Sequence, residues 1–192
     1  NLIALNDGVH RQDGTSANVT TITAPLIATR AQTFSNAMPP PSPSATTILV
    51  VESLNTAGFP ITMDTRSHAD ISLNNVSGTG SLAVTGSGRL LPAVITMTGA
   101  LSIQGTSVVL LNGSLGSISS VSIASGAILG LSPFSPVTIT QPVSLSGVIA
   151  ATDTTFTGTI TLPTGAKGRF NANAGETTTI SGRTQGAGKL AT

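Results

Sequence analysis

Two stretches decide the fold: TMTGALSIQG at residues 96–105 and TITQPVSLSG at residues 138–147. In each, an apolar residue between two threonines is followed by alternating apolar and polar residues and then by a glycine. Alternation has the period at which successive side chains of a β-strand point to opposite faces. Both stretches therefore predict short strands that end at turns.

The pattern recurs at a spacing of 21 residues. Five rows align without a gap, at residues 75–77, 96–98, 117–119, 138–140 and 159–161. The same frame aligns Gly105, Gly126, Gly147 and Gly168 in one column, and Leu82, Ile103, Ala124, Leu145 and Ala166 in another. A repeat of about 20 residues with short strands and a recurrent glycine is typical of a β-solenoid.

The predicted fold is therefore all-β: a short parallel β-helix of about five coils and about 21 residues per coil, roughly 24 Å long at about 4.8 Å per coil. We expect one apolar residue per row to point inward and form a stack, and the aligned glycines to form corners. The stacked residues would be Val76, Met97, Ile118, Ile139 and Ile160. Whether one chain or three intertwined chains close each coil is left open.

These rows resemble the coils of parallel β-helices in phage fibres, spikes and head-decoration proteins, and in autotransporter adhesin passengers. The resemblance covers about residues 75–179 and concerns architecture. It implies a structural protein and brings no catalytic residue with it.

The chain is poor in charge and rich in hydroxyl groups. Among 192 residues, 8% are charged and the net charge is +1, while there are 30 Thr and 23 Ser. No basic patch predicts nucleic-acid binding, and no run of about 18 apolar residues predicts a membrane-spanning helix. Without Cys, disulfides and thiolate metal sites are excluded. We expect no cofactor and no metal.

Residues 1–70 differ from the rest, since they hold both histidines and five of the seven acidic residues. We interpret them as an N-terminal attachment segment, irregular or β, with a Pro-rich connector at residues 39–43, and residues 71–192 as the solenoid with a C-terminal cap beginning near Ile180. Residues 19–22 and 47–52 are predicted strands. Residues 26–38 are the one place where a short helix is expected.

Two clusters in this segment could serve as metal or general-base sites: Asp7 with His10 and Asp13, and Asp64 with His68 and Asp70. We interpret them as ordinary polar groups of turns and loops. Ser67 beside His68 and Asp70 invites a triad reading, but triad members meet in space, not by adjacency in sequence.

Residues 90–152 contain no ionisable side chain. From Asn75 onward only Asp153 and Glu176 are acidic; they lie about one coil apart, and paired carboxylates are what glycoside hydrolysis requires. We interpret them as isolated surface acids. Sequons at Asn18, Asn75 and Asn112 are attributed to chance. The repeated threonine and serine ranks leave ice binding as an alternative.

The function predicted from these observations is a non-enzymatic structural protein: a virion decoration, cement or fibre protein of a phage that docks on a capsid or tail through its N-terminal segment. Its low charge favours a homo-oligomer, and the resemblance favours a trimer at the virion surface. The alternative is a bacterial cell-surface adhesin or passenger fragment located outside the cell. No nucleic acid or membrane insertion is expected.

Overall fold

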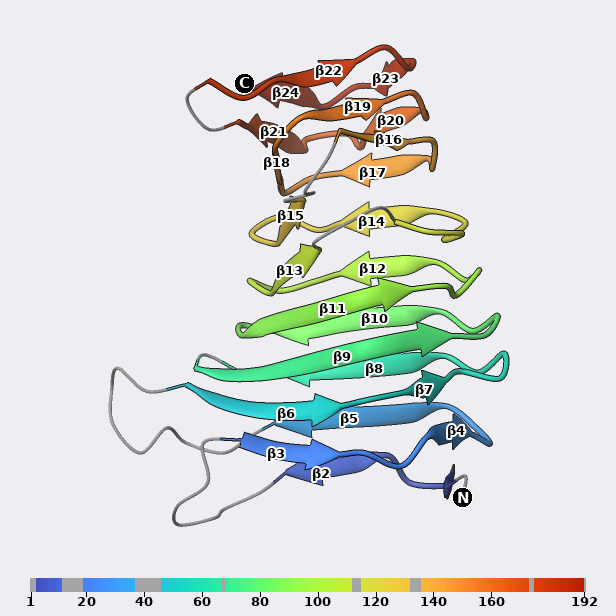
Figure 1. Ribbon diagram of the computed structural model, residues 1–192. Helices are drawn as coiled ribbons and strands as arrows, with labels where there is room; N and C mark the ends of the chain where they lie inside the picture. Colours follow the sequence, from blue (N-terminus) through green and yellow to red (C-terminus); the bar gives the residue numbers. More distant parts are fainter. Residues whose placement is uncertain are drawn as a thin grey trace.

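The computed structural model describes residues 3–11, 19–36, 46–66, 68–111, 115–131, 136–172 and 175–191. Strands, turns and bends make up these residues, and none of them is helical. The strands stack along one rod, with the N-terminal strands at one end and the C-terminal strands at the other (Figure 1). The strands are β1 (Ile3–Leu5), β2 (Val9–Arg11), β3 (Val19–Ile22), β4 (Leu26–Ala28), β5 (Gln32–Asn36), β6 (Thr47–Val51), β7 (Leu54–Asn55), β8 (Ile61–Thr65), β9 (Ala69–Ser77), β10 (Leu82–Gly86), β11 (Arg89–Ile95), β12 (Leu101–Ile103), β13 (Val108–Leu111), β14 (Val121–Ile123), β15 (Ile128–Leu131), β16 (Val137–Ile139), β17 (Val143–Leu145), β18 (Val148–Ala151), β19 (Thr154–Phe156), β20 (Ile160–Leu162), β21 (Lys167–Asn171), β22 (Thr178–Ile180), β23 (Thr184–Gly186) and β24 (Lys189–Ala191).

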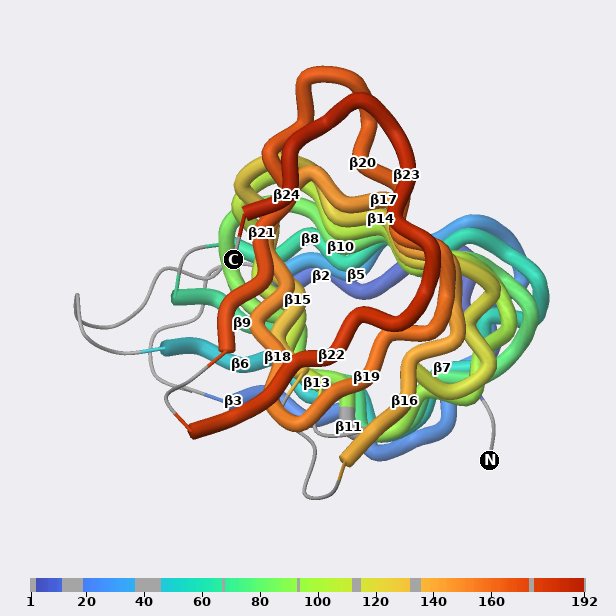
Figure 2. Tube along the Cα trace, turned by 90° about the horizontal axis from the view of Figure 1, so that it is seen from above, coloured from blue at the N-terminus to red at the C-terminus, as the bar shows by residue number. Residues whose placement is uncertain are grey.

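Three parallel sheets form the walls of the rod. The nine-stranded sheet has the order β2-β5-β8-β10-β12-β14-β17-β20-β23, and the twelve-stranded sheet follows β1-β4-β7-β9-β11-β13-β15-β18-β21-β24, with β6 joining β3 to β9. The three-stranded sheet is β16-β19-β22. Seen along the rod, the coils superpose around a common centre (Figure 2). The predicted parallel β-solenoid is confirmed, and one chain forms its coils.

The core is a continuous column of apolar side chains from alternate strand positions. In β12, for example, Leu101 and Ile103 are buried while Ser102 between them is partly exposed. Near the C-terminal end Phe156 and Phe170 pack edge to face, with ring centroids 5.3 Å apart. Burial of each such side chain contributes about 1.5–3 kcal/mol, so hydrophobic packing along the axis stabilises the rod.

The rod includes more of the chain than the repeat alone predicts. Strands β2, β5 and β8 precede residue 70 and continue the same nine-stranded sheet, and β23 extends it beyond residue 179. Nine strands spaced about 4.8 Å apart give a length of roughly 38 Å. The fold therefore has no break at residue 70, whereas the attachment role of residues 1–70 stays a prediction. The connector at 39–43 lies outside the described residues.

The short helix expected at residues 26–38 is wrong. This stretch contains β4 and β5, whose burial alternates, with Leu26, Ala28, Phe34 and Asn36 all facing inward. Because Phe34 is fully buried in the core, its packing decides the conformation over local helix propensity. The two expected strands are present as β3 and β6.

The inward positions of the repeat are predicted correctly, but the single stack is not. Val76, Met97, Ile118, Ile139 and Ile160 are each at most 2% exposed. Val76 pairs with Ile95 of the next coil, however, and Ile139 and Ile160 lie in different sheets. The physical reason is unequal coil length: Leu82 pairs with Leu101, 19 residues on, whereas Val143 pairs with Ile160, 17 residues on.

The glycines at several corners show why a side chain is not tolerated there. Gly86 has φ of +96°, and a Cβ there would lie 1.7 Å from the carbonyl oxygen of Thr65 in the preceding coil. Gly105 and Gly126, from the predicted column, also have positive φ and lie in turns. Gly168 lies within β21, so the corner prediction is wrong there. The chain near Ile180 and beyond forms a further coil with β22, β23 and β24, and its role as the C-terminal cap stays a prediction.

Candidate functional site

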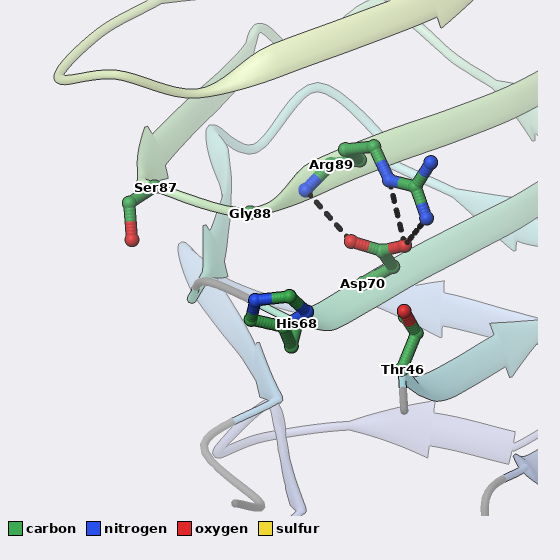
Figure 3. A pocket seen from close by; sticks show the side chains of 6 residues that line it. All are labelled: Thr46, His68, Asp70, Ser87, Gly88 and Arg89. Atoms are coloured by element: carbon green, nitrogen blue, oxygen red, sulfur yellow. Dashed lines mark hydrogen bonds and ion pairs between the residues drawn. The ribbon is translucent and has the colours of Figure 1, made fainter. Parts of the chain in front are cut away.

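A shallow cavity of about 360 Å³ opens where the chain passes from the nine-stranded sheet into the twelve-stranded sheet (Figure 3). Its lining residues are Thr46, His68, Asp70, Ser87, Gly88 and Arg89. Asp70 belongs to β9 and Arg89 to β11, so neighbouring coils supply its two charged groups. This cavity contains two of the residues singled out in the sequence, His68 and Asp70.

The Asp70 carboxylate is 1% exposed and fully engaged. Its Oδ1 accepts a hydrogen bond from the backbone N–H of Arg89 at 3.0 Å, and its Oδ2 accepts from Nε at 2.9 Å and Nη2 at 2.6 Å of the same residue. Its backbone carbonyl accepts from Asn36 Nδ2, which also bonds the carbonyl of Thr47. A buried carboxylate that accepts three hydrogen bonds from the next coil joins the two coils together.

His68 occupies a strained turn at the edge of the same cavity. Its φ is +60°, in the left-handed region, and Arg66 and Ala69 form a tight bridge around it. Asp64 lies on β8 in the other sheet, so the predicted cluster is not brought together as a set of ligands. Within the described residues no group of three His, Cys, Asp or Glu side chains could hold a metal. Ser67, the third residue of the triad reading, lies outside the described residues.

In the first cluster, Asp7 and His10 contact different residues. Asp7 forms an ion pair with Arg30, and both side chains are largely exposed. His10 Nδ1 is 2.8 Å from Ser35 Oγ. Asp13 lies outside the described residues. Asp7 and His10 therefore each contact a residue of the next coil.

One alignment of polar side chains was not predicted from the sequence. Parallel register places His10, Ser35, Asp64 and Thr85 in successive strands of the nine-stranded sheet, all in one outward column. Asp64 flanks Ser35 on the side away from His10, so it cannot orient the imidazole as the acid of a triad does. Thr85 Oγ1 lies 3.4 Å from Asp64 Oδ1. The signal was hidden because the first coils are longer than 21 residues: Val9 pairs with Phe34 and Gln32 with Ile61.

The two late acids lie in neighbouring coils, as their spacing indicated. Asp153 has φ of +42°, and its Oδ1 accepts a hydrogen bond from the backbone N–H of Thr177 at 3.4 Å. Glu176 precedes that threonine. A second cavity, of about 420 Å³ near Pro163 and Lys167, has no acidic residue in its lining. Neither cavity therefore presents the pair of carboxylates that glycoside hydrolysis uses.

The hydroxyl ranks follow the sheets instead of the 21-residue frame. Thr138 faces outward in the three-stranded sheet, whereas Thr161 does so in the nine-stranded sheet. One outward column of the nine-stranded sheet does carry hydroxyls in most coils: Thr33, Thr62, Ala83, Ser102, Ser122, Ser144, Thr161 and Gln185. The threonines and serines of the 21-residue repeat are thus divided between two sheets, and ice binding stays an alternative prediction.

Of the three sequons, Asn75 is exposed on β9, and Asn18 and Asn112 lie outside the described residues. The described residues also include no helix long and apolar enough to cross a bilayer. Comparison with known proteins found no matching family model, no similar curated protein and no similar solved structure.

Proposed function

We propose that this chain is a non-enzymatic structural protein, a decoration, cement or fibre component at the surface of a phage particle. The observation that supports this most is the use of its charged groups. Asp7–Arg30 and Asp70–Arg89 pair between coils. Ion pairs between neighbouring coils are compatible with a structural role, because they add to the contacts between coils.

Other ionisable groups follow the same rule. The Arg11 guanidinium is 8% exposed and donates from Nη1 to the carbonyl of Ile48 at 2.9 Å, and desolvation by burial lowers its pKa. Glu52 accepts from Asn74 Nδ2 in the following coil. Each contact crosses between coils, so polar side chains supplement the parallel hydrogen-bond ladder along the rod.

The N-terminal end of the rod is the proposed docking end. Ile3 is 45% exposed and Val19 is 51% exposed, and both lie on strands of the first coil. Among the described strands, β1 pairs only with β4 and β3 only with β6. Open strand edges next to exposed apolar side chains are suited to contact with a partner, which is consistent with attachment through residues 1–70.

The localisation is tested by fractionating a lysate of the source culture on a density gradient and following the chain with an antiserum. We expect it to band with virus particles and to stay with them after washing at high salt. Recovery with cell envelopes would favour the adhesin hypothesis and overturn the phage assignment.

The absence of catalysis is tested with the double variant Asp153→Asn/Glu176→Gln. Particle binding and stability are expected to equal those of the parent. Loss of a measurable polysaccharide-cleaving activity in this variant, with an unchanged circular dichroism spectrum, would show that the chain is an enzyme.

A further inference from the structure

The outer face of the twelve-stranded sheet carries a group of apolar side chains between β11 and β18. Register aligns its outward residues in two columns across β11, β13, β15 and β18. One column carries Val108, Ile128 and Val148, and the other carries Leu110, Gly130 and Ala150; Leu91, two residues after Arg89 on β11, is partly exposed on the same face. Apart from Gly130, which is buried, the residues in these columns are partly exposed, while the residues between them fill the core.

This composition is particular to one side of the rod. At the same levels, the outward positions of the nine-stranded sheet are Ser102, Ser122 and Ser144. Both sheets consist of parallel strands, so the type of strand pairing does not account for the contrast. A patch of branched aliphatic side chains in an otherwise hydroxyl-rich surface indicates a face that is covered in the assembled protein.

Polar groups border the apolar patch at both ends. Toward the N-terminus the columns continue into the Asp70–Arg89 ion pair and Ser72, and toward the C-terminus into Arg169 and Asn171. An apolar centre with a polar rim is the organisation of protein–protein interfaces. The centre is also flat, because Gly130 has no side chain and the Leu110 side chain leans over it.

We propose that this face packs against the same face of a second copy of the chain, forming a side-by-side pair of rods. Ridges spaced about 4.8 Å apart fit best against grooves of the same spacing, and a second copy supplies that spacing over the whole face. Both faces are neutral at the centre, so self-contact buries no unpaired charge there. The inference concerns assembly and does not depend on where the protein is attached.

The area of the face limits the affinity between the two copies. Seven strands from β6 to β21 and two outward columns cover about 34 Å by 14 Å, or about 480 Å² per copy. Two copies then cover about 950 Å², below the range of about 1,200–2,000 Å² for stable specific interfaces and within the range of weak, transient ones. The pair is therefore expected to be reversible. One flat face meets one partner face, so the geometry points to a twofold pair instead of the trimer expected from the resemblance.

The first test is the concentration dependence of mass in sedimentation equilibrium. The full chain is expected to shift from monomer to dimer as its concentration rises. Leu110→Arg should shift the dissociation constant upward at least tenfold, and the matched control Ser122→Arg, outward on the nine-stranded sheet, should leave it unchanged. Unfolding curves of both variants establish that they are folded.

A second readout uses the lack of cysteine. Ile128→Cys introduces a single thiol at the centre of the face, and Ser122→Cys introduces one on the nine-stranded sheet. Mild oxidation should link the first variant into a dimer much faster than the second. A monomer at all concentrations, a trimer, equal cross-linking of the two variants, or a dimer unaffected by Leu110→Arg would each overturn the face-to-face pair.

Discussion

At the scale of single residues, alternate positions on one strand have opposite roles. In β16, Ile139 is fully buried and Thr138 next to it is exposed. This assignment is accessible from the sequence because it depends only on the two-residue period of a strand. The contact between His10 and Ser35 is not, because it depends on the length of chain between them and so on the register of two coils.

Replacing Ile139 with Asp should unfold or strongly destabilise the rod. A buried carboxylate without a partner costs several kcal/mol, in addition to the lost packing. Thr138→Asp is the matched control and should change the free energy of unfolding by about 0.5 kcal/mol or less. Denaturant unfolding followed by far-ultraviolet circular dichroism measures both. Equal midpoints for the two variants would show that the inward assignment is incorrect.

At the scale of elements, coil length is controlled at the corners. From Ile61 onward in the nine-stranded sheet, the spacing between paired residues runs from 17, for Val143 and Ile160, to 24, for Ile160 and Thr184, while the strands keep their register. The mean over these coils is close to 21, which is why a fixed frame detects the repeat. The same frame fails to identify stacked neighbours, because longer and shorter coils shift the columns.

The corners therefore differ in their need for glycine. Gly86→Ala should destabilise the protein by more than about 2 kcal/mol, because the Cβ would overlap the Thr65 carbonyl in addition to the cost of positive φ. Gly165 also has positive φ, at +77°, but nothing lies within 4 Å of its Cβ position. Gly165→Ala should therefore cost only about 1 kcal/mol. Thermal and denaturant unfolding compare the pair, and a reversed order would contradict the steric argument.

At the scale of the whole molecule, the rod resembles a one-dimensional array in which each coil contacts its two neighbours. Such arrays lose structure most easily at their ends, since an end coil has one neighbour. In the described residues the coil nearest the C-terminus is the less covered one: all three residues of β23 are exposed, and Ile180 and Leu190 are only partly buried. This end effect follows from the architecture and could be anticipated once the solenoid was predicted.

Hydrogen exchange should show the gradient directly. Amides of β8 to β15 are expected to exchange most slowly, and those of β22, β23 and β24 at least tenfold faster after correction for intrinsic rates. The comparison is made at a concentration low enough to keep the chain monomeric. Uniform protection along the rod would indicate that it opens in one step instead of from its ends.

The stretch from residue 90 to residue 152 contains no ionisable side chain, and this affects how the folding free energy depends on pH. Proton uptake on unfolding requires groups whose affinity for protons differs between the folded and unfolded states. The side chains of these coils bind and release no protons, so their share of the folding free energy does not vary with pH. Any dependence of the stability on pH therefore has to come from the ionisable groups of residues 1–89 and 153–192.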